Sequence, residues 1–280
     1  MKKSRLAKVL TVSLAALMVF GLASCGGGSG KVSDKDITVI SREEGSGTRD
    51  AFTELTGVLQ DDVDKTVDTA EISNSTSVVT QSVAGNDAAI GYISLGSLDD
   101  TVKAVKVDGV EATVDNIKSG DYKIQRPFNI VTKGEVKELP ADFIKFIMSK
   151  DGQKIIEDEG YISVNENAEA YKASGLKGSI TLAGSTSVSP VMEVLADKYK
   201  ELNSGVTIEI QQTGSGAGIQ STTEGVCDIG MASRELKDEE TSQGLKSEEI
   251  ALDGIAVIVN KQNPVDELTS DQVMSIFTGE

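Results

Sequence analysis

SITLAGSTSVSPVMEVLADKYKEL, residues 179–202, is the stretch of sequence from which the fold can be predicted. Residues 179–183 have the short, apolar and β-branched character of a buried strand, and residues 184–190 form a turn rich in Gly and Ser. Pro190 suits the first turn of a helix, which the amphipathic pattern from Val191 to Leu202 continues. The stretch therefore predicts a strand, a tight turn and a helix in direct succession.

The same unit occurs twice more in the chain. Residues 37–41 form a β-branched strand that leads into Arg42-Glu-Glu-Gly-Ser-Gly-Thr-Arg49 and a helix from Asp50, and residues 206–210 lead into Thr213-Gly-Ser-Gly-Ala-Gly218 and another helical segment. Further strands are expected at 88–94, 125–132, 228–232 and 250–260, and further helices at 141–159 and 268–277. This alternation of strands and helices predicts an α/β fold.

Each of the three units predicts what we call an anion cup, a Gly/Ser-rich turn between a strand and a helix N-terminus. Such a turn presents backbone N–H groups without helical partners at the positive end of a helix dipole, which favours a bound anion. One such turn is weak evidence, because Gly and Ser commonly serve only to turn the chain. Three of them in one protein favour a shared anion, to which their hydroxyls would also donate: Ser46, Thr48, Ser185, Thr186, Ser187 and Ser215.

Two arginines flank the first anion cup. A guanidinium group can hold two oxygens of a tetrahedral oxyanion at once. Arg42 is expected at the strand end beside the turn, where it is predicted to be a ligand. For Arg49 a surface ion pair with a neighbouring acidic side chain is as well supported as a ligand role.

The N-terminal segment predicts export and attachment to a membrane by lipid. Basic residues precede an apolar run that ends in Leu22-Ala-Ser-Cys25, so that residues 1–24 are typical of a secretory signal peptide. The run is short for a bilayer span. Its end resembles a bacterial lipobox, which implies cleavage before Cys25, lipidation of that residue and a flexible spacer over 25–34. The expected location is the outer face of the cytoplasmic membrane.

Composition excludes several classes of function. The formal net charge is −17, which argues against nucleic acid as a partner, and the chain contains no histidine, which removes histidine-based catalysis and metal binding. None of the anion cups contains the Gly-Lys-Ser/Thr step of a nucleotide-binding loop. We therefore expect a binding protein, not an enzyme, that is monomeric and needs no cofactor or metal.

Six motifs lie at 42–49, 184–190, 213–218, 228–235, 251–260 and 276–279. Together they resemble the PstS-type phosphate-binding subunit of bacterial phosphate ABC importers. The resemblance implies a two-lobed, type II periplasmic-binding-protein fold that closes around dehydrated inorganic phosphate and delivers it to the permease subunits of the importer. It also implies phosphate ligands at Arg42, Ser46, Gly47, Thr48, Thr186, Ser187 and Ser215.

The sequence departs from this family at the position of one ligand. An aspartate there accepts the proton of hydrogen phosphate in well-known members, whereas here the position is Ser233, which is predicted to bind phosphate as a serine. A hydroxyl can accept as well as donate a hydrogen bond. Asp253 is a possible substitute acceptor, and a structural role in a turn before Gly254 is as well supported.

The order of the motifs also differs, because the segment at 42–49 precedes the others here and follows Ile276-Phe-Thr-Gly279 in the family. This predicts a circular permutation, with the family's old ends joined through a linker at about 167–178. One lobe would then comprise 35–95 plus 255–280 and the other 96–254, with hinge strands near 91–94 and 255–260. A truncated tandem fusion is the alternative.

Three other functions remain open from sequence. The protein could bind another tetrahedral oxyanion such as sulfate or molybdate, it could be a surface phosphohydrolase, or it could be a sensory lipoprotein with the same fold. The absence of histidine weighs against the hydrolase.

Overall fold

The computed structural model describes residues 36–280 of the chain. The predicted signal peptide, Cys25 and the spacer lie outside the described residues. Within residues 36–280, every helix is too short or too polar to cross a membrane.

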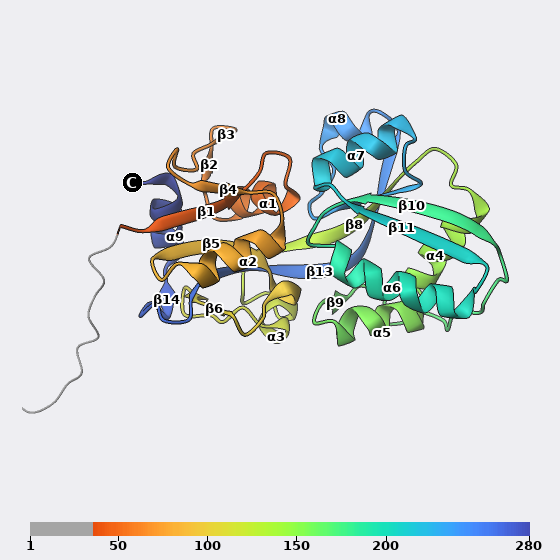
Figure 1. The fold of residues 1–280 in the computed structure, drawn as a ribbon, viewed down its shortest axis with the longest axis horizontal. Coiled ribbons are helices and arrows are strands. Elements are labelled where there is room, and N and C mark those ends of the chain that lie inside the picture. The colour runs from red at the N-terminus through yellow and green to blue at the C-terminus, as the bar shows by residue number, and fades with distance from the viewer. Residues whose placement is uncertain (1–35) are drawn as a thin grey trace, which may run out of the picture. The chain divides into compact units, whose positions relative to one another are not determined.

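The elements form two lobes, which lie at the two sides of Figure 1. The lobes are joined by the long strand β13 (Leu245–Asn260) and, beside it, by the chain at the start of β8. The first lobe contains β1 (Thr38–Arg42), α1 (Gly47–Leu55), β2 (Leu59–Gln60), β3 (Val63–Asp64), β4 (Glu71–Ser73), α2 (Thr76–Gly85), β5 (Ala89–Ser94), a 3-10 turn (Leu95–Ser97), β6 (Val102–Ala104), β7 (Lys106–Val107), α3 (Val114–Lys118), β14 (Glu267–Leu268) and α9 (Ser270–Thr278). The second contains β8 (Gln125–Lys133), α4 (Glu138–Ile147), α5 (Lys150–Asp158), β9 (Ile162–Ser163), β10 (Gly178–Gly184), α6 (Ser189–Leu202), β11 (Val206–Gln212), α7 (Ser215–Glu224), β12 (Ile229–Ala232) and α8 (Asp238–Thr241).

A single sheet runs through both lobes, with strand order β11-β10-β12-β8-β13-β5-β1-β4. The first half of β13 pairs with β8 and β9 in the second lobe, and its second half pairs with β5 and β6 in the first. In the first lobe β1 is parallel to β4 and β5, and in the second β10 is parallel to β11 and β12. The predicted α/β, two-lobed fold is confirmed.

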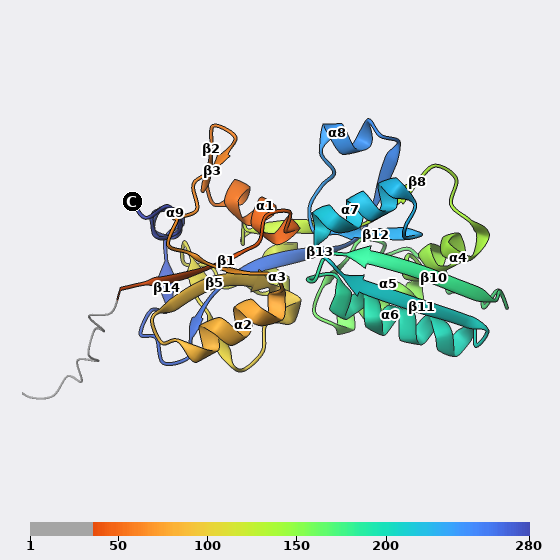
Figure 2. The ribbon, with the colours of Figure 1, turned by 45° about the horizontal axis from the view of Figure 1, so that its top comes forward.

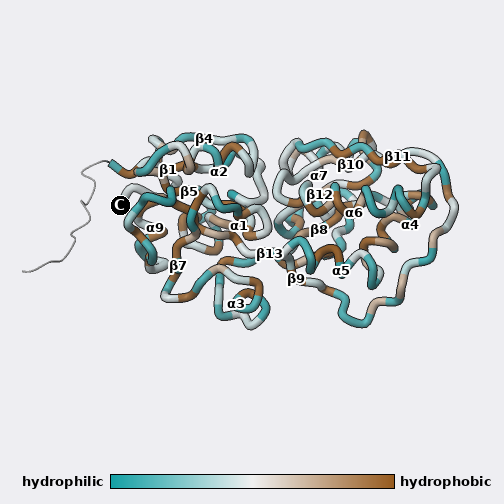
Figure 3. Tube along the Cα trace, turned by 60° about the horizontal axis from the view of Figure 1, so that its bottom comes forward, coloured by the Kyte–Doolittle hydropathy of each residue, from teal (hydrophilic) through white to brown (hydrophobic). Residues whose placement is uncertain are grey.

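Helices cover both faces of the sheet, which explains why a strand such as β5 is buried along its whole length. In β1, Val39 packs in the cluster that includes Phe52 of α1 and Phe277 of α9, whereas Ile40 packs in the cluster that includes Val79 of α2. Figure 2 shows α1 and α2 on opposite faces of β1 and β5, and the hydropathy colours of Figure 3 place apolar residues along these strands.

The boundary between the lobes differs from the predicted boundary at residues 95–96. Residues 96–124 were predicted in the second lobe, but Val107 and Tyr122 belong to the hydrophobic cluster of Phe52, and β6 pairs with β13 in the first lobe. The reason is the pairing of β6 with β13, which is distant in sequence and leaves no local pattern. The first lobe therefore extends to about residue 124.

The crossing between the lobes lies at two neighbouring strands. The cluster of the second lobe contains Phe128 and Ala251, and that of the first contains Ile124 and Ile255. The amide of Ile255 donates to the carbonyl oxygen of Ile124 at 2.8 Å. The chain thus crosses at 124–128 and 251–255. It does not cross at 91–94, because Tyr92 and Ile93 of β5 pack in the hydrophobic clusters of the first lobe.

The proposed permutation linker has no helix or strand from residue 167 to residue 177. It lies against the second lobe, where the Tyr171 hydroxyl donates to Asp142 at 2.5 Å and the Gly175 amide donates to Asn203 at 3.2 Å. Its role as the joint of a circular permutation stays a prediction.

Candidate functional site

Four helices begin at the edge where the two lobes face each other, directly after the ends of strands. Ser46 caps α1, Ser75 caps α2, and Gly214, with φ of 88°, precedes α7. The turn after β10 leads into α6, where Ser189 is the first helical residue. Because the carboxyl ends of parallel strands carry these turns, the helix N-termini of both lobes meet at one place. The three predicted anion cups are thereby brought together, and α2 adds a fourth N-terminus.

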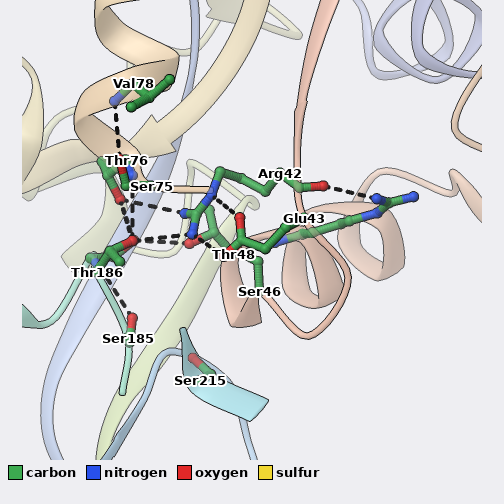
Figure 4. A network of polar contacts seen from close by, with 12 residues as sticks. Arg42, Glu43, Ser46, Thr48, Ser75, Thr76, Val78, Ser185, Thr186 and Ser215 are labelled. Atoms are coloured by element: carbon green, nitrogen blue, oxygen red, sulfur yellow. Dashed lines mark hydrogen bonds and ion pairs between the residues drawn. The ribbon is translucent and has the colours of Figure 1, made fainter. Parts of the chain in front are cut away.

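The guanidinium group of Arg42 lies where these helix N-termini meet, and the Arg42 side chain is 2% exposed. Its Nε and Nη2 donate to the two carboxylate oxygens of Glu43, each at 2.8 Å. Nη2 also donates to the Thr186 hydroxyl at 3.1 Å, and Nη1 donates to Thr76 at 3.5 Å. Figure 4 shows the guanidinium between Glu43 and these two threonines. Glu43 therefore fixes one edge of the fork and leaves the other facing hydroxyls of both lobes.

Buried hydroxyls join the lobes beside Arg42. The Thr48 and Ser187 hydroxyls lie 2.9 Å apart, and Thr76 Oγ1 lies 3.1 Å from Ser187 Oγ and 3.2 Å from Thr186 Oγ1. All four side chains are buried. Each hydroxyl can donate or accept, so the same groups that contact one another across the lobes could also donate to an anion.

The third anion cup contacts the first at Gly47. A Cβ atom on Gly47 would lie 2.5 Å from Ser215 Oγ and 2.7 Å from Ser233 Oγ, distances that leave room only for hydrogen. The two serine hydroxyls lie 3.3 Å apart, and the Gly216 amide donates to the carbonyl oxygen of Gly45 at 2.9 Å. The backbone of the α1 N-terminus thus rests on two serines of the opposite lobe.

The structure brings together Arg42, Gly47, Thr48, Thr186, Ser187, Ser215 and Ser233, all of which sequence reasoning named. Ser46 is also buried, but its hydroxyl accepts from the Arg49 amide at 3.4 Å as a helix cap. Sequence reasoning missed Thr76. The one local sign was Ser75, a residue type that favours helix starts.

Arg49, whose role the sequence left open, faces away from the hydroxyls. Its Nε lies 2.6 Å from the Asp64 carboxylate, and its Nη1 donates to the carbonyl oxygen of Arg42 at 2.8 Å. It braces the end of β1 that carries Arg42. The acidic partner is Asp64, not one of the acidic neighbours in the motif.

Asp253 lies in β13, not in a turn, and belongs to a buried ion pair. The Arg126 guanidinium contacts Asp253 Oδ2 at 3.1 Å, with both side chains 1% exposed, and the Ser94 hydroxyl donates to Oδ1 at 2.8 Å. Burial raises the pKa of Asp253 to about 6, although Arg126 and Ser94 lower it. Arg126 also donates to the carbonyl oxygen of Ser233 at 3.4 Å, so the pair supports the turn that carries this serine.

The arrangement brings a guanidinium edge, several hydroxyls and the N-termini of four helices together at one place where the lobes meet. Such a set of donors suits an anion with several oxygens. Within residues 36–280, no group of Cys, Asp or Glu is placed to hold a metal ion.

Known proteins are similar to this chain over nearly its whole length. A profile described as PBP superfamily domain matches residues 29–151 and 169–280. A phosphate-binding protein PstS 2 of Streptococcus agalactiae is 51% identical over 100% of this chain and 97% of that protein. One of Streptococcus pneumoniae is 47% identical over 97% and 96%. The crystal structure of a phosphate ABC transporter phosphate-binding protein from Streptococcus pneumoniae, 48% identical, covers 88% of this chain and 96% of that one with a TM-score of 0.70.

Proposed function

We propose that this chain, which belongs to the PstS-type family of phosphate-binding proteins, captures inorganic phosphate between its two lobes and delivers it to an ABC importer. The observation that carries the proposal is the meeting of the buried Arg42 fork with hydroxyls of both lobes. A ligand that contacts both lobes favours the closed state by its differential affinity for that state. The role is binding and delivery, without a covalent step.

The proposed ligands follow from the donors that converge. Arg42 would supply the charge, through the guanidinium edge that faces Thr76 and Thr186. The hydroxyls of Thr48, Thr76, Thr186, Ser187, Ser215 and Ser233 and the helix N-terminus at Ser46 and Gly47 would supply the remaining hydrogen bonds. Charge-assisted hydrogen bonds contribute about 1.5–3 kcal/mol each, so a few of them suffice for tight binding.

Calorimetric titration of the phosphate-stripped protein lacking residues 1–24 tests this proposal. Phosphate is expected to bind tightly, and sulfate and molybdate weakly. Equal or tighter binding of sulfate would favour a receptor for another oxyanion. Ser233 is compatible with that alternative, because a serine can donate a hydrogen bond to a fully ionised oxyanion. No binding of any of these anions would overturn the proposal. Turnover of a generic phosphoester, with and without divalent metal, would favour a phosphohydrolase.

Gly47→Ala is expected to weaken phosphate binding at least about tenfold, or 1.4 kcal/mol. The added methyl group would meet two buried serine hydroxyls of the other lobe, so that closure is blocked while each lobe keeps its own core. Titration gives the affinity and thermal unfolding gives the stability. Gly85→Ala is the matched control, because a Cβ there meets nothing within 4 Å. Equal affinities of the two variants would contradict the close approach at Gly47.

Anchoring and delivery belong to the same proposal. Lipidation of Cys25 would hold the protein at the outer face of the cytoplasmic membrane as a monomer, within reach of the permease subunits. Cys25→Ser is expected to abolish incorporation of labelled fatty acid into the protein in growing cells, which the label in the immunoprecipitated protein measures. Incorporation of the label into the variant would contradict lipidation of Cys25, and unchanged phosphate uptake by cells lacking the protein would favour a sensory role.

A further inference from the structure

A second set of contacts joins the lobes outside the hydroxyl cluster, and it consists of charges. Asp50 lies in the first turn of α1, two residues after Thr48. Its Oδ2 lies 2.9 Å from Nε of Arg234, the residue that follows Ser233 in the opposite lobe. Lys237 lies 3.7 Å from the same oxygen. The charges thus sit directly beside two of the proposed ligand turns.

Hydrogen bonds within the second lobe orient the Arg234 side chain toward this contact. Its Nη1 and Nη2 each donate to the Glu240 carboxylate at 2.8 Å, and Nη1 also donates to the carbonyl oxygen of Glu235. Burial lowers the pKa of Arg234, but the hydrogen bonds and charge of Glu240, together with Asp50, outweigh that effect and the pKa is raised. The Nη edge is therefore occupied within the second lobe, and the Nε edge faces the first lobe.

The contact between the lobes excludes water. Asp50 Oδ2 and Arg234 Nε are both covered, although the angle between them does not make an aligned hydrogen bond. The interaction is thus an ion pair whose strength comes from charge and low local solvation. It exists only while the lobes touch, since Asp50 and Arg234 belong to different lobes.

We propose that Asp50 and Arg234 form a latch that slows the opening of the closed lobes and so sets how long phosphate stays bound. This inference rests on the proposed function. Neither residue is needed to touch the ligand, so both act as positioning residues through lobe closure. Because the pair forms late, when the lobes meet, its loss changes dissociation more than association.

The main test compares Asp50→Asn with Glu54→Gln, which removes a carboxylate from the next turn of α1. Stopped-flow measurement of phosphate release is expected to show dissociation at least about fivefold faster in Asp50→Asn, with association changed less than twofold. Glu54→Gln should match the wild type in both rates. Asp50→Glu should restore part of the slow release. Equal release from Asp50→Asn and Glu54→Gln would overturn the latch and leave phosphate capture intact.

A second measurement needs no ligand. The Gly216 amide donates across the lobes to the Gly45 carbonyl oxygen, so its hydrogen exchange reports on lobe opening. In the phosphate-free protein this amide is expected to exchange faster in Asp50→Asn than in Glu54→Gln. Failure of the wild type to bind phosphate would contradict the proposed function. The exchange measurement would still test the latch in that case, because it uses the phosphate-free protein. Identical exchange in both variants would overturn the latch on its own.

Discussion

Replacing Arg42 with alanine is expected to weaken phosphate binding at least about 100-fold, because two charge-assisted hydrogen bonds of about 1.5–3 kcal/mol each are lost. The side chain is buried and Glu43 holds one edge of its fork, so the other edge meets the anion in a fixed orientation. Calorimetric titration of phosphate measures the effect.

Two further variants separate the charge from the geometry. Arg42→Lys keeps the charge but cannot hold Glu43 and Thr186 at once, so an affinity between those of the wild type and Arg42→Ala is expected. Arg42→Ala combined with Glu43→Gln removes the carboxylate that the single variant leaves without its partner. The double variant should bind as weakly as Arg42→Ala, since the fork is what the anion needs.

Arg49→Lys is the matched control in the same motif. Arg49 contacts Asp64 and a backbone carbonyl oxygen, and its replacement is expected to change the phosphate affinity less than about fourfold, or 0.8 kcal/mol. Arg42→Ala with an affinity inside this range would remove Arg42 from the site. A large loss in Arg49→Lys instead would show that bracing of β1 matters as much as the fork.

Sequence patterns predicted the anion cups because each depends on residues close together in the chain. Pro190, Gly184 and the hydroxyls between them specify a turn and a helix start without reference to the rest of the fold. The N-terminus of α2 follows a strand of three residues and contains no glycine, so Thr76 carried only the weak signal of the Ser75 cap. Its place beside Thr186 depends on how the lobes meet, which local patterns do not contain.

The lobe boundary was missed for a related reason. Val102 and Ala104 pair with Asn260 and Ile258, more than 150 residues later in the chain. Strands as short as β6 and β7 lack enough residues to show a period, and their partners are chosen by long-range packing. The Asp50–Arg234 contact lies beyond sequence reasoning too, since ion pairs between lobes follow only from the assembled fold.

Arg126→Met is expected to lower the free energy of unfolding at pH 7 by about 3–5 kcal/mol, because buried Asp253 loses its charged partner and must take up a proton or stay ionised without compensation. The loss should depend on pH. Burial already raises the pKa of Asp253 to about 6, and removing Arg126 raises it further. A raised folded-state pKa means that ionisation costs stability above that pKa, so the cost disappears as pH falls and the carboxyl takes up a proton.

Urea denaturation at pH 7 and pH 5 measures this effect. About 1.4 kcal/mol of the loss should vanish between these values, because the wild-type carboxyl ionises near pH 6 and that of the variant above pH 7. Arg126→Met combined with Asp253→Leu should recover most of the stability, since an apolar pair needs no charge compensation. Lys154→Met, which breaks an exposed pair with Asp158, should leave the denaturation midpoint unchanged. A loss in Arg126→Met that is equal at both pH values would mean that Arg126 stabilises the crossing by packing on Phe128, and not by holding the charge of Asp253.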